Sequence, residues 1–167
     1  MTGLQHKDDY FETPPTIVTN IEGETGLNFN VDVCANELNK KCHYYISESD
    51  DALKCTWKQR FSHPTVAFCN PPRSKNGKMV LRALEQWKTG DIDIVMLLCW
   101  NDLGNKYCEE VRKNLFNGTF GYGNLGKVAF WKNGKPVLNV DKKTGKLVEF
   151  PSRLAYFWCW MKSTHNI

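Results

Sequence analysis

Ile92–Cys99 (IDIVMLLC) is the clearest candidate for a buried strand in this chain, and Thr65–Cys69 (TVAFC) is a second. Short apolar runs of this kind, bounded by polar and turn-forming residues, are typical of strands that are covered on both faces of a sheet. Between them, segment 77–88 carries apolar residues at helical spacing. A strand, a helix and a strand in this order predict a parallel pair within an α/β sheet.

The segments before this unit predict the same alternation. Thr13-Pro14-Pro15 is typical of an N-cap followed by proline in the first helical turn, so we expect a helix that Gly23 and Gly26 close. Segment 29–35 (FNVDVCA) predicts another buried strand. The remaining elements expected here are a brief helix at 36–42 and a short strand at 43–46.

The segments after this unit change from alternation to antiparallel pairing. We expect a helix at 104–116, a flexible glycine-rich turn at 121–126, and strands at 127–131, 136–140 and 153–161. Asn133-Gly134 and Lys143-Thr144-Gly145 are typical of the turns between such strands. The whole pattern predicts a single α/β domain over 1–167, with a mostly parallel central sheet and an antiparallel C-terminal hairpin.

Composition excludes several classes of protein. The chain has 167 residues, of which 41% are hydrophobic and 13% aromatic, enough for a core and too much for a disordered protein. Its apolar runs are far shorter than the ~20 residues that span a bilayer, and segment 1–15 shows no secretory signal. The seven cysteines form no C-x-x-C pair, and no histidines are spaced for zinc. We therefore expect reduced thiols, no bound metal and a cytoplasmic location.

The net charge of +4 arises in the second half of the chain. Within segment 127–146 the only acidic residue is Asp141. The lysines that it faces are Lys127, Lys132, Lys135, Lys142, Lys143 and Lys146. A surplus of lysines in one segment indicates a polyanionic partner, although a solvated lysine-rich loop would have the same composition.

Polar residues directly follow the strand at Thr65–Cys69. Asn70-Pro71-Pro72-Arg73 contains two consecutive prolines, which fix the backbone φ and remove two N–H donors. The Asn70 side-chain oxygen and the Pro71 carbonyl can then form a pair of acceptors for an exocyclic amino group. Such a group is a poor nucleophile when it is conjugated with a ring, so a protein has to position it and stabilise developing positive charge. The same residues also make a strand-ending turn without any function.

Acidic residues and a helix start supply a second candidate site. The helix N-terminus at Thr13 and Pro14 would attract a carboxylate, and Asp32, two residues before Cys34, would bind an ammonium group. Acceptors for ribose hydroxyls and an adenine amino group are available at Glu48, Asp50 and Asp51. Together these groups match the polar ends of S-adenosylmethionine. Taken singly, each is also explained as a helix cap or a surface acid, and the glycine pattern of a dinucleotide site is absent.

Six stretches occur in a characteristic order: YFETP (10–14), FNVDVCA (29–35), ESDDAL with the following Trp57 (48–57), FCNPP (68–72), VMLL (95–98) and GKVAF (126–130). In this order they resemble the phage DNA N6-adenine methyltransferase (Dam-like) family. The resemblance implies a seven-stranded, Rossmann-like methyltransferase sheet with a reversed terminal hairpin. It puts Thr13 and Pro14 at the methionine end of S-adenosylmethionine, Asp32 in the cofactor motif and Asp51 at the cofactor's adenine. It makes Asn70, Pro71 and Pro72 the motif that binds the target amino group.

One position departs from the family pattern. Arg73 stands where the family has Tyr, Phe or Trp, whose ring stacks on the flipped base. A guanidinium plane can stack as well, and Trp100 and Phe120 are further candidates for the platform. Arg73 also leaves open a protein that binds the cofactor without efficient turnover.

The resemblance and the residues together predict S-adenosylmethionine-dependent methyl transfer to adenine N6 in double-stranded DNA. We expect direct transfer with base flipping, because the amino group is otherwise paired inside the duplex. The lysines of 127–146 are the expected phosphate contacts, and neither a membrane nor a metal takes part. The alternatives are a catalytically weak, methyltransferase-like protein that binds nucleic acid, and transfer to cytosine N4. The expected location is the host cytoplasm if a phage encodes the protein.

Overall fold

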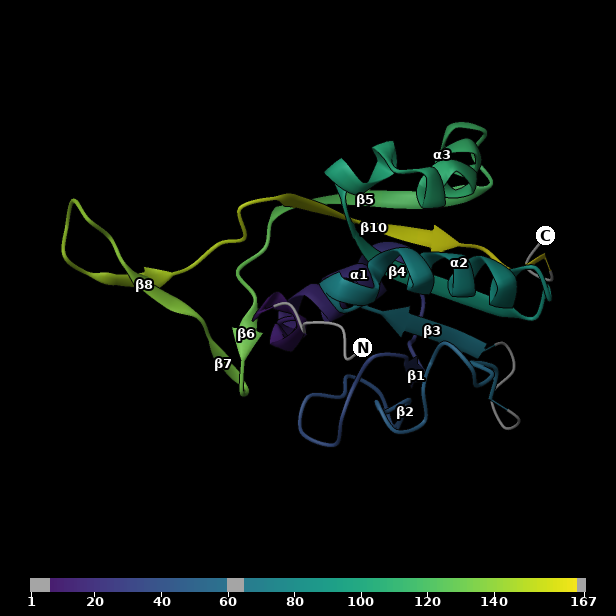
Figure 1. Ribbon diagram of the computed structural model, residues 1–167, viewed down its shortest axis with the longest axis horizontal. Helices are drawn as coiled ribbons and strands as arrows, with labels where there is room; N and C mark the ends of the chain where they lie inside the picture. The colour runs from purple at the N-terminus through teal and green to yellow at the C-terminus, as the bar shows by residue number, and fades with distance from the viewer. Residues whose placement is uncertain (1–6, 60–64, 165–167) are drawn as a thin grey trace, which may run out of the picture.

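A computed structural model describes residues 7–59 and 65–164, and its centre is a six-stranded sheet with the strand order β2-β1-β3-β4-β10-β5 (Figure 1). The strands of this sheet are β1 (Val31–Asp32), β2 (Tyr44–Tyr45), β3 (Thr65–Cys69), β4 (Ile92–Cys99), β5 (Phe120–Lys127) and β10 (Ala155–Met161). The pairs β1–β2, β1–β3 and β3–β4 are parallel, whereas β10 runs antiparallel to both β4 and β5. The predicted α/β class, with a mostly parallel sheet and a reversed C-terminal strand, is confirmed.

The two strands that decide the fold have the predicted limits. Every residue of β3 and β4 is buried, and the strands pair in register from Thr65 opposite Ile92 to Cys69 opposite Met96. Central position in the sheet explains their continuous apolar sequence, because helices cover both faces.

Helices lie on both faces of this sheet (Figure 1). The helix α1 (Pro15–Thr25) packs Val18 and Ile21 against one face, whereas α2 (Asn76–Trp87) and α3 (Glu109–Phe116) contribute to the hydrophobic core on the other. Pro15 occupies the first turn of α1, and Gly26 ends the helix in the left-handed conformation with a φ of 71°. Thr13 does not cap this helix, since the N-cap residue is Pro14.

Several predicted elements are shorter than expected or absent. The strand predicted at 29–35 is reduced to β1, and the helix predicted at 104–116 begins only at α3, after the 3₁₀ turns η3 (Trp100–Gly104) and η4 (Lys106–Cys108). No helix forms at 36–42. There the Asn36 side-chain oxygen accepts the N–H groups of Leu38 and Asn39, which favours local turns over a helix. The remaining 3₁₀ turns are η1 (Lys7–Tyr10) and η2 (Arg73–Lys75).

The glycine-rich segment was expected to be a flexible turn, and this expectation is wrong. It forms the edge strand β5, which pairs with β10 along its whole length. The strand expected at 127–131 does not form, since 128–130 is irregular, whereas the strand expected at 136–140 is present in part as β8 (Leu138–Val140). Two small ribbons result, β6 (Trp131–Lys132) with β7 (Lys135–Pro136) and β8 with β9 (Leu147–Glu149). These ribbons, residues 131–149, extend away from the sheet and are called the arm below (Figure 1).

Candidate functional site

A pocket of about 340 Å³ opens at the carboxyl ends of β1 and β3. Its size falls in the range of roughly 300–1,000 Å³ that is typical of small-molecule sites. Most of the lining residues come from four segments, 9–13, 32–41, 46–53 and 68–75, and Met79 and Asn133 complete the walls. The predicted site residues that line it are Thr13, Asp32, Cys34, Glu48, Asp51, Asn70 and Pro72. The structure therefore brings together, in one cavity, residues from both candidate sites of the sequence.

Asp32 ends β1 inside this pocket and is only 4% exposed. Burial raises the pKa of its carboxyl from 3.8 to about 6, and hydrogen bonds from the backbone N–H groups of Lys41 and Cys34 oppose the rise. The two bonds measure 3.0 and 3.4 Å. A cationic ligand group beside Asp32 would favour the charged carboxylate that burial penalises. The site is therefore suited to an ammonium group.

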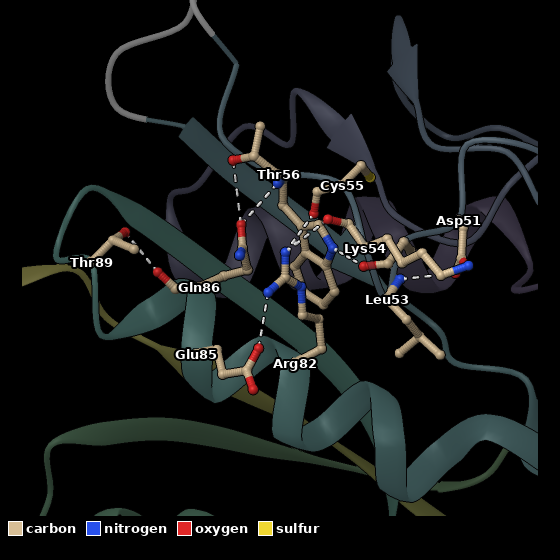
Figure 2. Close-up of polar contacts among 11 residues, drawn as sticks. Asp51, Leu53, Lys54, Cys55, Thr56, Arg82, Glu85, Gln86 and Thr89 are labelled. Carbon is tan, nitrogen blue, oxygen red and sulfur yellow. Dashed lines mark hydrogen bonds and ion pairs between the residues drawn. The ribbon is translucent and has the colours of Figure 1, made fainter.

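The segment that carries Asp51 is fastened to α2 (Figure 2). Arg82 donates to the carbonyl oxygens of Cys55 at 2.8 Å and Lys54 at 3.4 Å, and the side-chain oxygen of Gln86 accepts the N–H of Trp57 at 2.9 Å. These contacts hold a tight turn in which Asp51 has a positive φ of 55°.

Asp51 lines the pocket, and its carboxylate has two partners within the protein. It accepts the Leu53 N–H at 3.2 Å and pairs with the Lys54 ammonium at 2.8 Å. The hydrogen bond from Lys54 lowers the pKa of Asp51 below its usual value. A charged acceptor at this wall can bind hydroxyl or amino donors of a ligand.

The proline motif lies at the end of β3 and opens into the same cavity. Asn70 and Pro72 line the pocket, whereas Pro71 is buried and is not part of the lining. Arg73 also lies outside the lining. Its guanidinium donates to Asp102 Oδ2 at 3.0 Å and to the Cys99 thiol at 3.1 Å, so it contacts the end of β4 instead of the pocket.

Other predicted residues have local roles in the structure. Pro14 is the N-cap of α1 and does not line the pocket. Asp50 lies outside the lining too, and its carboxylate accepts the Ser47 N–H at 2.9 Å and the Ser47 hydroxyl at 2.6 Å. Glu48 is largely exposed at the rim, 3.8 Å from the Lys75 ammonium.

Several residues of the pocket escaped the sequence analysis. Asp9 accepts the Ser74 N–H at 2.9 Å and hydroxyl at 2.6 Å, which ties η1 to the turn after the two prolines. Glu12 pairs with Trp131 through two backbone hydrogen bonds and so fixes the base of the arm beside the pocket. These contacts cannot be predicted from a local sequence pattern, since each joins residues far apart in the sequence. The pocket-lining residues that were not named as site candidates include Asp9, Tyr10, Phe11, Glu12, Lys41, Lys75 and Asn133.

All six lysines predicted to contact a polyanion are exposed. Lys127 ends β5, Lys132 and Lys135 lie in the first ribbon of the arm, and Lys142, Lys143 and Lys146 lie at or beside the turn of the second. Among residues 7–59 and 65–164, none of the six pairs with a carboxylate. The arm is therefore a positively charged projection beside the pocket.

Two further features concern the described part of the chain alone. There, no three His, Cys, Asp or Glu side chains gather in a way that could hold a metal ion. None of its helices has the length and the apolar surface needed to span a bilayer.

Residues 2–154 match the family described as DNA N-6-adenine-methyltransferase (Dam). Two phage proteins named DNA N-6-adenine-methyltransferase are similar to part of the chain. The protein of Haemophilus phage HP1 is 31% identical over 90 residues, which cover 54% of this chain and 49% of the relative. The protein of Escherichia phage T1 is 30% identical over 89 residues, which cover 53% of this chain and 35% of the relative.

The chain thus spans about half of one relative and about a third of the other. No solved structure shows a significant match. The family match covers far more than half of the chain, and residues of the stretches FNVDVCA (29–35) and FCNPP (68–72), both within the matched range, line the pocket. The chain belongs to the DNA N-6-adenine-methyltransferase (Dam) family.

Proposed function

We propose that this protein transfers a methyl group from S-adenosylmethionine to N6 of adenine in double-stranded DNA, as a single Rossmann-like domain in the host cytoplasm. One observation carries the proposal: residues expected at the cofactor and residues expected at the target amino group line the same pocket. The names of the two phage relatives support the choice of substrate. The position of β10, reversed between β4 and β5, supports a methyltransferase type of sheet.

The pocket suits the polar groups of S-adenosylmethionine. Asp32 would accept the ammonium of the methionine part, and its buried carboxylate gains most from a cationic neighbour. Glu48 and Asp51 would accept the ribose hydroxyls and the adenine amino group. Thr13, just before the N-terminus of α1, would lie near the cofactor's carboxylate. Cys34 would contact the cofactor's apolar atoms. When bound, the cofactor supplies an electrophilic methyl group on a sulfonium.

The proline motif would orient the target amino group. The Asn70 side-chain oxygen accepts one N–H of that group and so favours the positive charge that develops on nitrogen during transfer. Pro72, which also lines the cavity, keeps the turn stiff. Adenine has to leave the duplex stack to reach this turn. The exposed lysines of the arm would contact phosphates and position the duplex without reading its sequence.

Transfer of tritiated methyl from S-adenosylmethionine to unmodified DNA tests the proposal, and digestion to nucleosides identifies the product. We expect the label in N6-methyl-2′-deoxyadenosine. Label in N4-methylcytosine would support the alternative base, because the same acceptors serve both amino groups. Binding of both ligands without transfer would support the catalytically weak nucleic-acid-binding protein.

The Asn70→Ala variant tests the assignment of the catalytic residue. Transfer should be lost, whereas the affinity for S-adenosylmethionine should stay largely intact, because the cofactor acceptors are unchanged. Asn20→Ala is the matched control, since Asn20 is exposed on α1 and does not line the pocket. Transfer by Asn70→Ala at the wild-type rate would remove this residue from the mechanism.

A further inference from the structure

The position that follows the two prolines does not supply a ring to the pocket. Arg73 stands there, and its guanidinium is held by Asp102 and by the Cys99 thiol at the end of β4. A base that leaves the duplex loses its stacking partners and needs a flat apolar surface in exchange. If the proposed function holds, another residue of the pocket has to provide that surface.

Three aromatic side chains line the pocket: Tyr10, Phe11 and Phe68. Phe68 is only 1% exposed and packs against Phe29 at a centroid distance of 5.3 Å. Phe11 stacks on Phe130 with an interplanar angle of 13°. Each of these two rings packs against another ring of the protein. Tyr10 has the larger exposed surface, with 53% of it accessible.

The two rings suggested by the sequence do not reach the pocket. Trp100 stacks on Phe157 at 4.4 Å, and Phe120 is 2% exposed and packs edge-on against Trp87 at 4.8 Å. Neither lines the cavity. Tyr10 is therefore the ring that combines exposure with a position in the pocket wall.

Tyr10 is also held close to the proline motif. The preceding residue, Asp9, binds both the backbone N–H and the hydroxyl of Ser74, the second residue after Pro72. The Lys132 ammonium of the arm lies over the Tyr10 ring, 6.0 Å from its centroid. Tyr10 therefore follows a residue that binds the turn after the prolines, and a cation suited to a phosphate lies near its ring.

We propose that Tyr10 stacks on the flipped target base and takes the role of the aromatic side chain that the family pattern has at the position of Arg73. The proposal rests on the proposed function, because it assigns a role within the same reaction. It also explains how a chain with arginine after the prolines can hold a base beside Asn70. The Lys132 ammonium would then neutralise the phosphate next to that base.

Methyl transfer to unmodified DNA by Tyr10 variants tests the proposal. Loss of the ring in Tyr10→Ala should lower kcat/KM for DNA by about 10- to 100-fold, since that is the scale of one base–aromatic stack. Tyr10→Phe and Tyr10→Trp keep a ring and should retain transfer. The affinity for S-adenosylmethionine should not change in any of them. Tyr10→Leu repeats the test if the alanine variant fails to fold.

Tyr122→Ala is the matched control. Tyr122 is 56% exposed on β5 and packs edge-on against Trp100, outside the pocket. Normal transfer by Tyr10→Ala, or a loss of cofactor affinity in that variant, would overturn the role of Tyr10. If Tyr122→Ala lost transfer and Tyr10→Ala did not, the stacking surface for the base would be assigned to the region of Trp100 and Tyr122 instead. No transfer by the wild-type protein would overturn the proposed function itself.

Discussion

The guanidinium of Arg73 and the carboxylate of Asp102 join the turn after β3 to the turn after β4, with 3.0 Å between Nη1 and Oδ2. Asp102 is 6% exposed and also accepts a hydrogen bond from Asn76 at 2.8 Å. Asn76 is the first residue of α2, so one buried carboxylate binds both the middle and the end of the loop that follows Asn70. Arg73 therefore stabilises the proline motif from outside the pocket.

Arg73→Ala should destabilise the protein, because the buried Asp102 carboxylate loses its cationic partner. Its remaining side-chain hydrogen bond is the one from Asn76. We expect the free energy of unfolding to fall by about 1–3 kcal/mol, as measured by urea denaturation. Arg153→Ala is the control, since Arg153 is exposed and a surface change of this kind has little effect. An unchanged midpoint for Arg73→Ala would show that the ion pair does not stabilise the loop.

Asp32 should make the free energy of unfolding decrease as the pH rises, the opposite of the usual effect of an aspartate. Burial raises its pKa from 3.8 to about 6, so between these values the folded state binds more protons than the unfolded state. This contribution to stability is present at low pH and is lost as the pH rises through about 6. Relative to Asp32→Asn, the wild type should lose up to about 3 kcal/mol between pH ~4 and ~7 in urea denaturation. A constant difference between the two proteins across this range would contradict the raised pKa.

Cofactor affinity should change with pH in the opposite sense. The ammonium group needs the charged form of Asp32, so the affinity for S-adenosylhomocysteine, which carries the same ammonium, should fall as the pH drops below about 6. Titration calorimetry should show a limiting decrease of about tenfold per pH unit. Asp32→Asn should bind weakly with a flat profile over this range. The same pH profile in both proteins would assign the ammonium to another acceptor.

The sequence predicts those parts of the fold that depend on local burial. β3 and β4 are predicted with their limits because strands covered on both faces need continuous apolar sequence. β5 is missed because its glycines resemble a turn. A Cβ atom on Gly123 would lie 2.4 Å from the Trp158 side chain of β10, so a bulky neighbour requires glycine there. That requirement comes from a residue far away in the sequence.

The residues of the pocket likewise fall into those that local sequence predicts and those that depend on distant contacts. Asp32 and Asn70 are predictable because each directly follows or ends a buried parallel strand, and such ends meet at one edge of a sheet. Asp9 and Tyr10 are not predictable, because their place depends on the contact between Asp9 and Ser74. The position of Asn133 depends likewise on the pairing of Glu12 with Trp131.

Gly123→Ala should therefore weaken the edge of the sheet. The added methyl group would collide with the Trp158 ring, which is 7% exposed and cannot easily move. We expect a loss of about 1–3 kcal/mol in the free energy of unfolding. Gly23→Ala is the control, because that glycine lies inside α1 with no atom near its Cβ position, and alanine should stabilise the helix slightly. Equal stability of the two variants would show that β5 does not need its glycine.

The arm should account for much of the salt dependence of DNA binding. Lys142 and Lys143 lie at the exposed turn of its second ribbon, where the Asp141 carboxylate accepts the Lys143 N–H at 2.7 Å and holds the turn in shape. Removing two phosphate contacts reduces the release of counterions on binding. In the double variant Lys142→Ala/Lys143→Ala, the slope of log affinity against log salt concentration should fall by about 1–2.

Lys88→Ala/Lys113→Ala makes the same change in net charge away from the arm. Both of these lysines are exposed and pair with glutamates of α3, Lys88 with Glu110 and Lys113 with Glu109. Fluorescence anisotropy of labelled duplex DNA at several salt concentrations compares the two double variants with the wild type. The arm variant should change the slope, and the control should leave it near the wild-type value. Equal slopes in all three proteins would show that the arm is a solvated ribbon, and that the duplex is bound by another surface.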